Sequence, residues 1–208
     1  CHSPAGNARF QTLGTGDYDS PLHHHHIEGS AGSQCKNCHM AERVYMGIDA
    51  RSDHSFRVPR PDLSAETGAP DTCTACHSDK APDWAAGLLE GWFPNSSRRG
   101  THFGQTFAKA RQNPAAVARE LEAIARDPAQ PSVVRATALS LMQPLSTPAM
   151  ASKTVDLLGA NDPLIRSAAV ALQRAAPGGQ RAARLLPALT DPILSVRIAA
   201  AKQMFDVA

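Results

Sequence analysis

The chain contains one short pattern twice, as CKNCH at Cys35–His39 and as CTACH at Cys73–His77. In each copy two cysteines stand three positions apart, and a histidine follows the second cysteine directly. Two thiols at this spacing can each form a thioether with one edge of the same porphyrin, and the next histidine then lies beneath the iron. The pattern therefore predicts two covalent haem c sites, with Cys35, Cys38, Cys73 and Cys76 as attachment residues and His39 and His77 as proximal iron ligands.

Apolar residues are distributed unevenly around these motifs. Residues 1–112 contain nine Leu, Ile and Val residues, whereas residues 113–208 contain 23. All five cysteines and all nine histidines lie in the first segment. Because that segment has too little aliphatic material for an ordinary core, we expect haem to organise it. The expected boundary near Asn113 separates a loop-rich multihaem cytochrome c domain (1–112) from an Ala- and Leu-rich domain (113–208).

The remaining cysteine is also followed by a histidine, as Cys1-His2. We interpret this pair as the end of a third haem c motif, with Cys1 as an attachment residue and His2 as a proximal ligand, so that the sequence begins inside a haem site. A lipid-modified first cysteine and an ordinary thiol are the alternatives.

The two intact motifs also have alternative interpretations, a disulfide within each pair or a four-cysteine zinc site. Zinc ribbons usually separate their cysteine pairs by about 15–20 residues. Here 34 residues lie between Cys38 and Cys73, and zinc leaves the two following histidines unexplained. The sequence therefore favours haem.

Six further histidines are candidates for the distal axial position, namely His23, His24, His25, His26, His54 and His102. An iron with two histidine ligands has no open position, so this supply favours electron transfer over substrate binding. An internal expression tag and a solvated histidine cluster without metal are the alternatives for the run of four histidines, and an ordinary position without a ligand role is the alternative for the others. Thr101 is expected to cap a helix with His102 on one side.

A further helix is expected at 82–93. Trp84, Leu88 and Trp92 recur there at every fourth position and make one apolar face. In a segment with so few aliphatic residues, we expect this face to pack against a porphyrin.

From Asn113 onward the sequence repeats with a period of 31 residues, which separates Arg135, Arg166 and Arg197. The pairs Asp162-Pro163 and Asp191-Pro192 are expected to mark the turn into the second helix of each helix pair. The segment resembles the short HEAT-like repeat, which implies about three helix pairs stacked as an α-solenoid and a bracing role for the arginines. A plain Ala-rich helical bundle is the alternative.

Four stretches together resemble a family of bacterial multihaem cytochromes that fuse a haem domain to HEAT-like or tetratricopeptide-type repeats. They are His23–His26, Cys35–Met40, Asp53–Pro61 and the stretch from Trp84 to Phe103. The resemblance implies that distal ligands come from the run of four histidines, His54 and His102. The motif order is also similar to the haem pairs of cytochrome c nitrite reductase, whose active haem uses a proximal lysine, but no Cys-x-x-Cys-Lys occurs here.

These observations predict a mainly α protein that transfers electrons between haems, with redox partner proteins docking on the helical repeats. The alternatives are a haem-dependent reductase of small nitrogen or sulfur compounds and a zinc-binding scaffold without redox activity. The formal charge of +2, without long basic or acidic runs, does not indicate nucleic-acid binding. No apolar run is long enough to span a bilayer. Because thioethers to haem are made outside the cytoplasm, we expect a periplasmic or cell-surface location.

Overall fold

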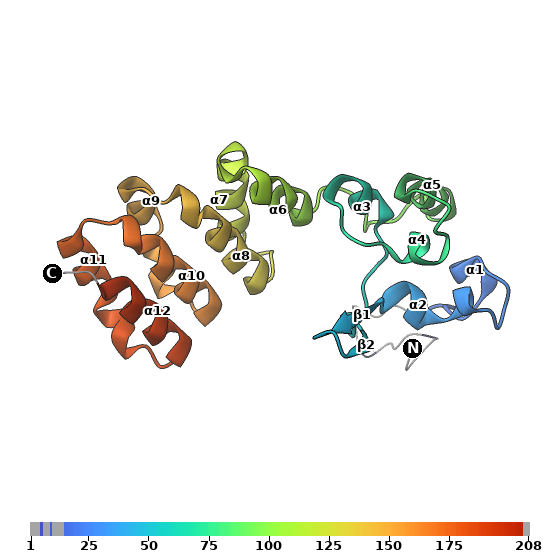
Figure 1. Ribbon diagram of the computed structural model, residues 1–208, viewed down its shortest axis with the longest axis horizontal. Helices are drawn as coiled ribbons and strands as arrows, with labels where there is room; N and C mark the ends of the chain where they lie inside the picture. The colour runs from blue at the N-terminus through green and yellow to red at the C-terminus, as the bar shows by residue number, and fades with distance from the viewer. Residues whose placement is uncertain (1–4, 6–8, 10–14, 206–208) are drawn as a thin grey trace. The chain divides into compact units, whose positions relative to one another are not determined.

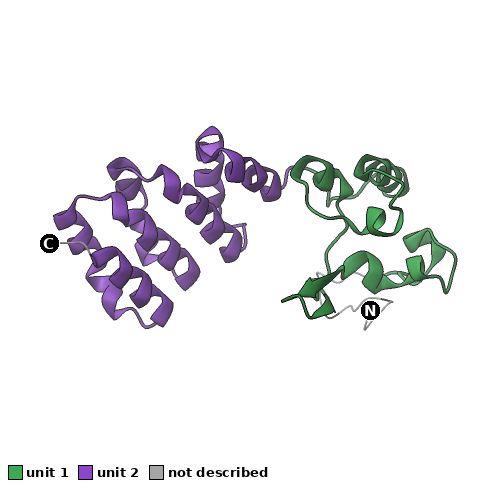
Figure 2. Ribbon diagram, viewed as in Figure 1, with its two compact units in different colours: residues 1–100 green, residues 101–208 purple. Residues whose placement is uncertain are grey.

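The computed structural model describes residue 5, residue 9 and residues 15–205, so the expected Cys1-His2 haem site lies outside the described residues. The chain divides into two compact units, residues 1–100 (unit 1) and residues 101–208 (unit 2), which are coloured separately in Figure 2. Helices dominate both units, and the described residues contain a single two-stranded sheet. The expected mainly α class is therefore confirmed.

Unit 1 consists of short helices joined by loops, as Figure 1 shows. Its elements are α1 (Pro21–His24), the 3-10 turn η1 (Ala31–Ser33), α2 (Cys35–His39), β1 (Glu42–Tyr45), β2 (Asp49–Ser52), α3 (Pro61–Thr67), α4 (Thr72–Cys76) and α5 (Pro82–Trp92). The two strands form an antiparallel hairpin in which Glu42 pairs with Ser52. Proline occupies the first turn of α1, α3 and α5, where its missing N–H costs no hydrogen bond. The helix expected at 82–93 is confirmed as α5.

Few side chains are buried in unit 1. Among its described residues only Pro61, Leu63, Ser64 and Ala85 are buried, and they belong to α3 and α5, which pack against each other. Leu22, Ile27 and Ile48 are more than four-fifths exposed. The described part of unit 1 therefore has no extended aliphatic core, in agreement with its composition.

Unit 2 is built from α-helices and short 3-10 segments. They are α6 (Phe103–Gln112), η2 (Pro114–Val117), α7 (Ala118–Arg126), α8 (Ser132–Met142), η3 (Gln143–Leu145), α9 (Pro148–Lys153), η4 (Val155–Gly159), α10 (Pro163–Leu172), η5 (Gln173–Ala175), α11 (Gly178–Leu185), η6 (Pro187–Thr190) and α12 (Leu194–Met204). Consecutive long helices pack against each other, α7 on α8, α8 on α10 and α10 on α12.

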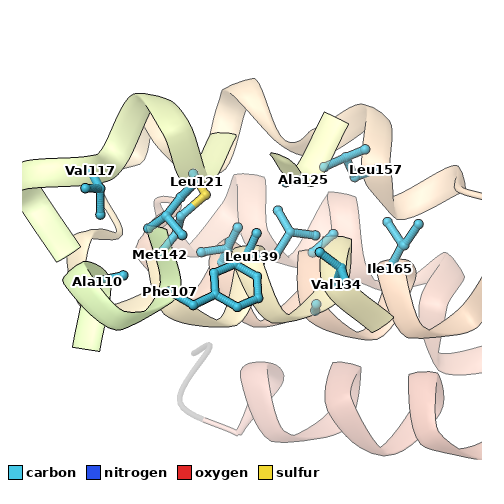
Figure 3. Packing of buried hydrophobic residues seen from close by; sticks show 14 residues of the cluster. Phe107, Ala110, Val117, Leu121, Ala125, Val134, Leu139, Met142, Leu157 and Ile165 are labelled. Carbon is cyan, nitrogen blue, oxygen red and sulfur yellow. The ribbon is translucent and has the colours of Figure 1, made fainter. Parts of the chain in front are cut away.

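The core of unit 2 is a cluster of buried apolar side chains from α6, η2, α7, α8, η4 and α10. In Figure 3 the side chains of Phe107, Leu121, Leu139 and Met142 lie together between these helices. A second cluster joins α10, α11 and α12 and contains Val170, Leu185, Val196 and Ala200. Unit 2 therefore contains its own hydrophobic core.

The two units divide between Gly100 and Thr101, one helix before the boundary expected near Asn113. The cause is α6, whose Phe107 and Ala110 are 5 % and 3 % exposed within the core of unit 2. Because α6 contains no Leu, Ile or Val, composition alone assigns it to the aliphatic-poor segment.

The three arginines of the 31-residue period make similar hydrogen bonds. Each guanidinium donates to backbone carbonyls at or just after the end of the preceding helical segment, where such groups lack helical partners. The pairs are Arg135 with Ala125, Arg166 with Ala160 and Asn161, and Arg197 with Asp191 and Pro192. Arg166 also makes a two-pronged ion pair with the Asp191 carboxylate, at 2.8 and 3.0 Å.

Candidate haem-binding site

The two CxxCH motifs lie on short helices that pack against each other. Cys35, Cys38 and His39 belong to α2, while α4 carries Cys73 and Cys76, and His77 follows as its C-cap residue. In a helix, residues three apart lie on the same face, so each helix turns both of its thiols to one side. The carboxylate of Asp71 caps α4 by accepting hydrogen bonds from the N–H groups of Cys73 and Thr74, at 2.9 and 3.0 Å.

All four thiols of these motifs are free, and cysteines on one helix change the pKa of cysteines on the other. Burial raises the pKa of Cys38, and the charges of Cys76 and Cys35 raise it further. Burial also raises the pKa of Cys73 to about 11, with additional contributions from the charges of Asp71 and Cys38. The two pairs are therefore close neighbours, and Cys38 and Cys73 are held mainly as thiols near neutral pH.

His39 is oriented by two hydrogen bonds to one residue. Its Nδ1–H donates to the carbonyl of Arg57 at 2.7 Å, and the Arg57 N–H donates to the carbonyl of His39 at 2.9 Å. Since Nδ1 carries the proton, Nε2 has a lone pair that can bind a metal. The ring of Phe56 stacks on the imidazole, with centroids 4.7 Å apart and 8° between the planes.

His23, from α1, lies beside His39. The two imidazole centroids are 6.0 Å apart, with 8° between the ring planes. Burial lowers the pKa of His23, and the neighbouring histidines, His39 first among them, lower it further. The neutral imidazole that a metal requires is therefore favoured at His23.

His26 lies beside His77 in a second pair of the same kind. The centroids are 6.1 Å apart, with 35° between the planes. The His26 Nδ1–H donates to the carbonyl of His24, which leaves the Nε2 lone pair for a ligand. Gly32 lies so close that a Cβ there would stand 2.1 Å from Cδ2 of His26. A side chain at position 32 would therefore displace the imidazole.

The other two histidines of the run make different contacts. Nδ1 of His24 accepts a hydrogen bond from the His26 N–H, so its neutral ring carries the proton on Nε2. His25 has a left-handed backbone (φ 54°), and its ring stacks on Trp92 with centroids 4.1 Å apart. Among the described residues, neither the His24 ring nor the His25 ring makes a ring contact with His39 or His77.

His54 and His102 make hydrogen bonds of different kinds. His54 is exposed, and its Nδ1–H donates to the carbonyl of Ser52 at 2.9 Å, which leaves its Nε2 accessible. His102 is itself the N-cap of α6, in place of the expected Thr101, because its Nδ1 accepts from the Gly104 N–H at 3.1 Å. This cap places the proton of the neutral imidazole on Nε2, where an iron would have to bind.

Aromatic side chains gather around the histidine pairs. Trp84 contacts His77, with centroids 5.1 Å apart, and Phe93 contacts both His23 and His25. Phe56, Trp84 and Trp92 remain 44 %, 37 % and 36 % exposed, so their faces are covered only in part by protein. A flat apolar group such as a porphyrin fits this setting, because it would cover aromatic faces that the chain leaves open.

Sequence reasoning identified the cysteines, the histidines and Trp84, but it missed three positioning groups. These are the Arg57 carbonyl, the Phe56 ring and the small Gly32. Phe56 and Arg57 stand two and three positions after His54, so the resemblance of residues 53–61 to multihaem cytochromes was the available signal. Nothing in the sequence marks Gly32, since its role depends on where the His26 ring lies.

Two searches of the described residues gave negative results. No group of three or more His, Cys, Asp or Glu residues among them is arranged to hold a metal ion without a cofactor. No helix within the described part of the chain combines the length and the apolar character needed to cross a bilayer. Comparison with known proteins found no matching family model, no matching curated protein and no matching solved structure.

Proposed function

We propose that unit 1 is the electron-transferring part of a multihaem c-type cytochrome and carries two haem c groups. One is attached through Cys35 and Cys38, with His39 as proximal ligand, and the other through Cys73 and Cys76, with His77 as proximal ligand. The observation that carries the proposal is that each motif histidine has a second histidine beside it, at 6.0 and 6.1 Å. Two histidines at each iron leave no position for a substrate, which favours electron transfer over reduction of a bound molecule.

When bound, the haems would supply a reversible one-electron couple of iron. The chain's own groups would attach, orient and shield them. The Arg57 carbonyl holds the His39 ring in the tautomer that binds metal through Nε2, which also raises the basicity of the imidazole. Aromatic side chains, Trp84 among them, would cover the porphyrin and lower the local dielectric constant. Ligand basicity and this local dielectric constant are both factors that set the reduction potential of a haem. Because α2 and α4 pack together, the two haems would be close enough to exchange electrons.

For unit 2 we propose a HEAT-like solenoid that docks redox partner proteins. The hydrogen bonds of Arg166 and Arg197 to carbonyls six and five residues before them support repeated helix pairs, since they recur at the same points of two successive repeats, and Arg135 bonds the Ala125 carbonyl near the end of α7. A periplasmic or cell-surface location follows from the proposed haem attachment.

The test is to produce the full chain in a host that ligates haem c and to measure its intact mass and visible spectrum. The proposal expects the mass of two added haems and a low-spin spectrum. A third haem is not expected, because the motif at Cys1 is incomplete. The matched variant Cys35→Ala/Cys38→Ala should lose one haem and keep the other. A colourless chain with an unmodified mass that is nevertheless compactly folded would overturn the proposal, and a high-spin iron that binds nitrite or carbon monoxide would favour a reductase.

A further inference from the structure

The four histidines of the run differ in whether their rings lie beside the histidine of a CxxCH motif. His23 and His26 each lie beside the histidine of a CxxCH motif, whereas His24 and His25 do not. We infer that His23 and His26 are distal ligands of two different haems, His23 for the haem on α2 and His26 for the haem on α4. This inference rests on the proposed function and adds the pairing of ligands to irons.

The spacing within each pair is the first argument. Two metal–imidazole bonds of about 2.0 Å, with about 1.1 Å from each nitrogen to its ring centre, put the centroids of two axial imidazoles about 6 Å apart. The measured separations are 6.0 Å for His23 and His39 and 6.1 Å for His26 and His77. Two independent pairs therefore have the separation of ligands on opposite sides of one iron.

The hydrogen bonds of the rings supply the second argument. His26 and His39 both donate from Nδ1 to a backbone carbonyl, so Nε2 is the ligating nitrogen in each. His24 uses Nδ1 as an acceptor and carries the proton on Nε2, which makes it a poor ligand in this arrangement. The structure thus separates neighbouring histidines by tautomer.

The backbone explains how two residues only three positions apart can serve two irons. In a continuous helix His23 and His26 would lie on one face and point the same way. Helix α1 instead stops at His24, and His25 takes the left-handed conformation with its N–H bonded to the carbonyl of Pro21. After this turn the His26 ring lies beside His77, the residue that follows α4, while the His23 ring lies beside His39.

Gly32 belongs to the same site as a positioning residue. A Cβ at this position would overlap the His26 imidazole at 2.1 Å, so the glycine leaves the space in which the ring lies. Apart from the neighbouring backbone of its own helix, nothing lies within 4 Å of a Cβ built at Gly87, which makes Gly87→Ala the matched control for Gly32→Ala.

The experiment uses the haem-loaded full chain and reads the low-spin ferric signal by electron paramagnetic resonance. His23→Ala and His26→Ala should each halve that signal and produce a high-spin iron. In the Cys35→Ala/Cys38→Ala background, which keeps only the haem on α4, His26→Ala should abolish the low-spin signal and His23→Ala should leave it unchanged. In the Cys73→Ala/Cys76→Ala background the two results should be reversed.

Three further variants complete the test. His24→Ala should keep both low-spin irons, as should His25→Gly, which removes the ring but retains the left-handed turn. Gly32→Ala should reduce the low-spin signal of the α4 haem only, while Gly87→Ala should not. The pairing is overturned if the two backgrounds give the opposite pattern, or if His24→Ala or His25→Gly removes a low-spin iron. Absence of haem from every variant and from the parent chain would instead contradict the proposed function itself.

Discussion

In unit 2 the side chains of Leu121, Leu139 and Leu185 are at most 1 % exposed, whereas in unit 1 Phe56 and Trp84 remain 44 % and 37 % exposed. The helices of unit 2 enclose apolar side chains from many elements, and those of unit 1 bring together thiols, imidazoles and partly covered aromatic rings. Two parts of one chain, of similar length, thus reach a compact form by different means. Burial of its own aliphatic groups stabilises unit 2, whereas for unit 1 we propose that the haems it would bind supply the missing stabilisation.

Removing haem attachment should have the largest effect on this contrast. The fourfold variant Cys35→Ala/Cys38→Ala/Cys73→Ala/Cys76→Ala leaves the described residues of unit 1 with only a small buried contact, between α3 and α5. Such a region cannot offset the conformational entropy of its chain, so it should lose its protection from hydrogen exchange. Exchange measured by mass spectrometry should show this loss in residues 15–100 and unchanged protection in α7, α8 and α10. Full protection of unit 1 without haem would remove the difference between the units.

A cavity in the core of unit 2 should have the next largest effect. Leu139 on α8 is 1 % exposed, so Leu139→Ala should lower the free energy of unfolding by about 2–5 kcal/mol. Urea denaturation followed by helical circular dichroism measures this change. The matched variant Leu164→Ala removes a leucine that is 51 % exposed and should change stability far less. Equal effects of the two variants would mean that burial does not explain the stability of unit 2.

Removing the N-terminal cap of α4, in unit 1, should have a smaller effect on stability. Asp71→Ala removes the carboxylate that accepts from the N–H groups of Cys73 and Thr74. Loss of such a cap costs about 0.5–2 kcal/mol. In the haem-loaded chain the thermal midpoint, followed by circular dichroism in the haem absorption band, should therefore fall modestly. Asp79→Ala, which removes an exposed carboxylate from the same region, serves as the control and should leave the midpoint unchanged.

The smallest effect should come from the ion pair of Arg126 and Asp156 on the surface of unit 2. A hydrogen bond from Arg126, at 2.8 Å, lowers the pKa of Asp156 below its usual value. The pair therefore contributes stability above the unfolded pKa of about 3.9 and loses it as pH falls through the lower folded pKa. Since the carboxylate is 61 % exposed and solvent screens it, Asp156→Asn should cost only about 0.2–1 kcal/mol at pH 7.

The measurement for this pair is urea denaturation at pH 7 and at pH 3. The difference between the parent chain and Asp156→Asn should shrink at the lower pH, and it should also shrink in high salt. A difference that grows on acidification would contradict the assigned direction of the pKa change.

Much of this arrangement follows from local sequence. The CxxCH motifs, the helix with Trp84 and Trp92, and the mainly α class could all be predicted, because each depends on spacing along the chain. The arginines at 31-residue intervals were likewise visible, and each donates to a backbone carbonyl of unit 2, while their bracing role in a repeat stays a prediction. The proposed haem content and solenoid remain predictions.

The sequence by itself determined which chemistry-bearing residues occur and the contrast in aliphatic content between the two parts of the chain. The tertiary structure alone decided which histidines stand together, since His23 and His39, and His26 and His77, are far apart along the chain. It also assigned α6 to unit 2 and the cap of that helix to His102. The physical reason is that tautomers, ring separations and burial depend on contacts between distant segments, which local spacing does not encode.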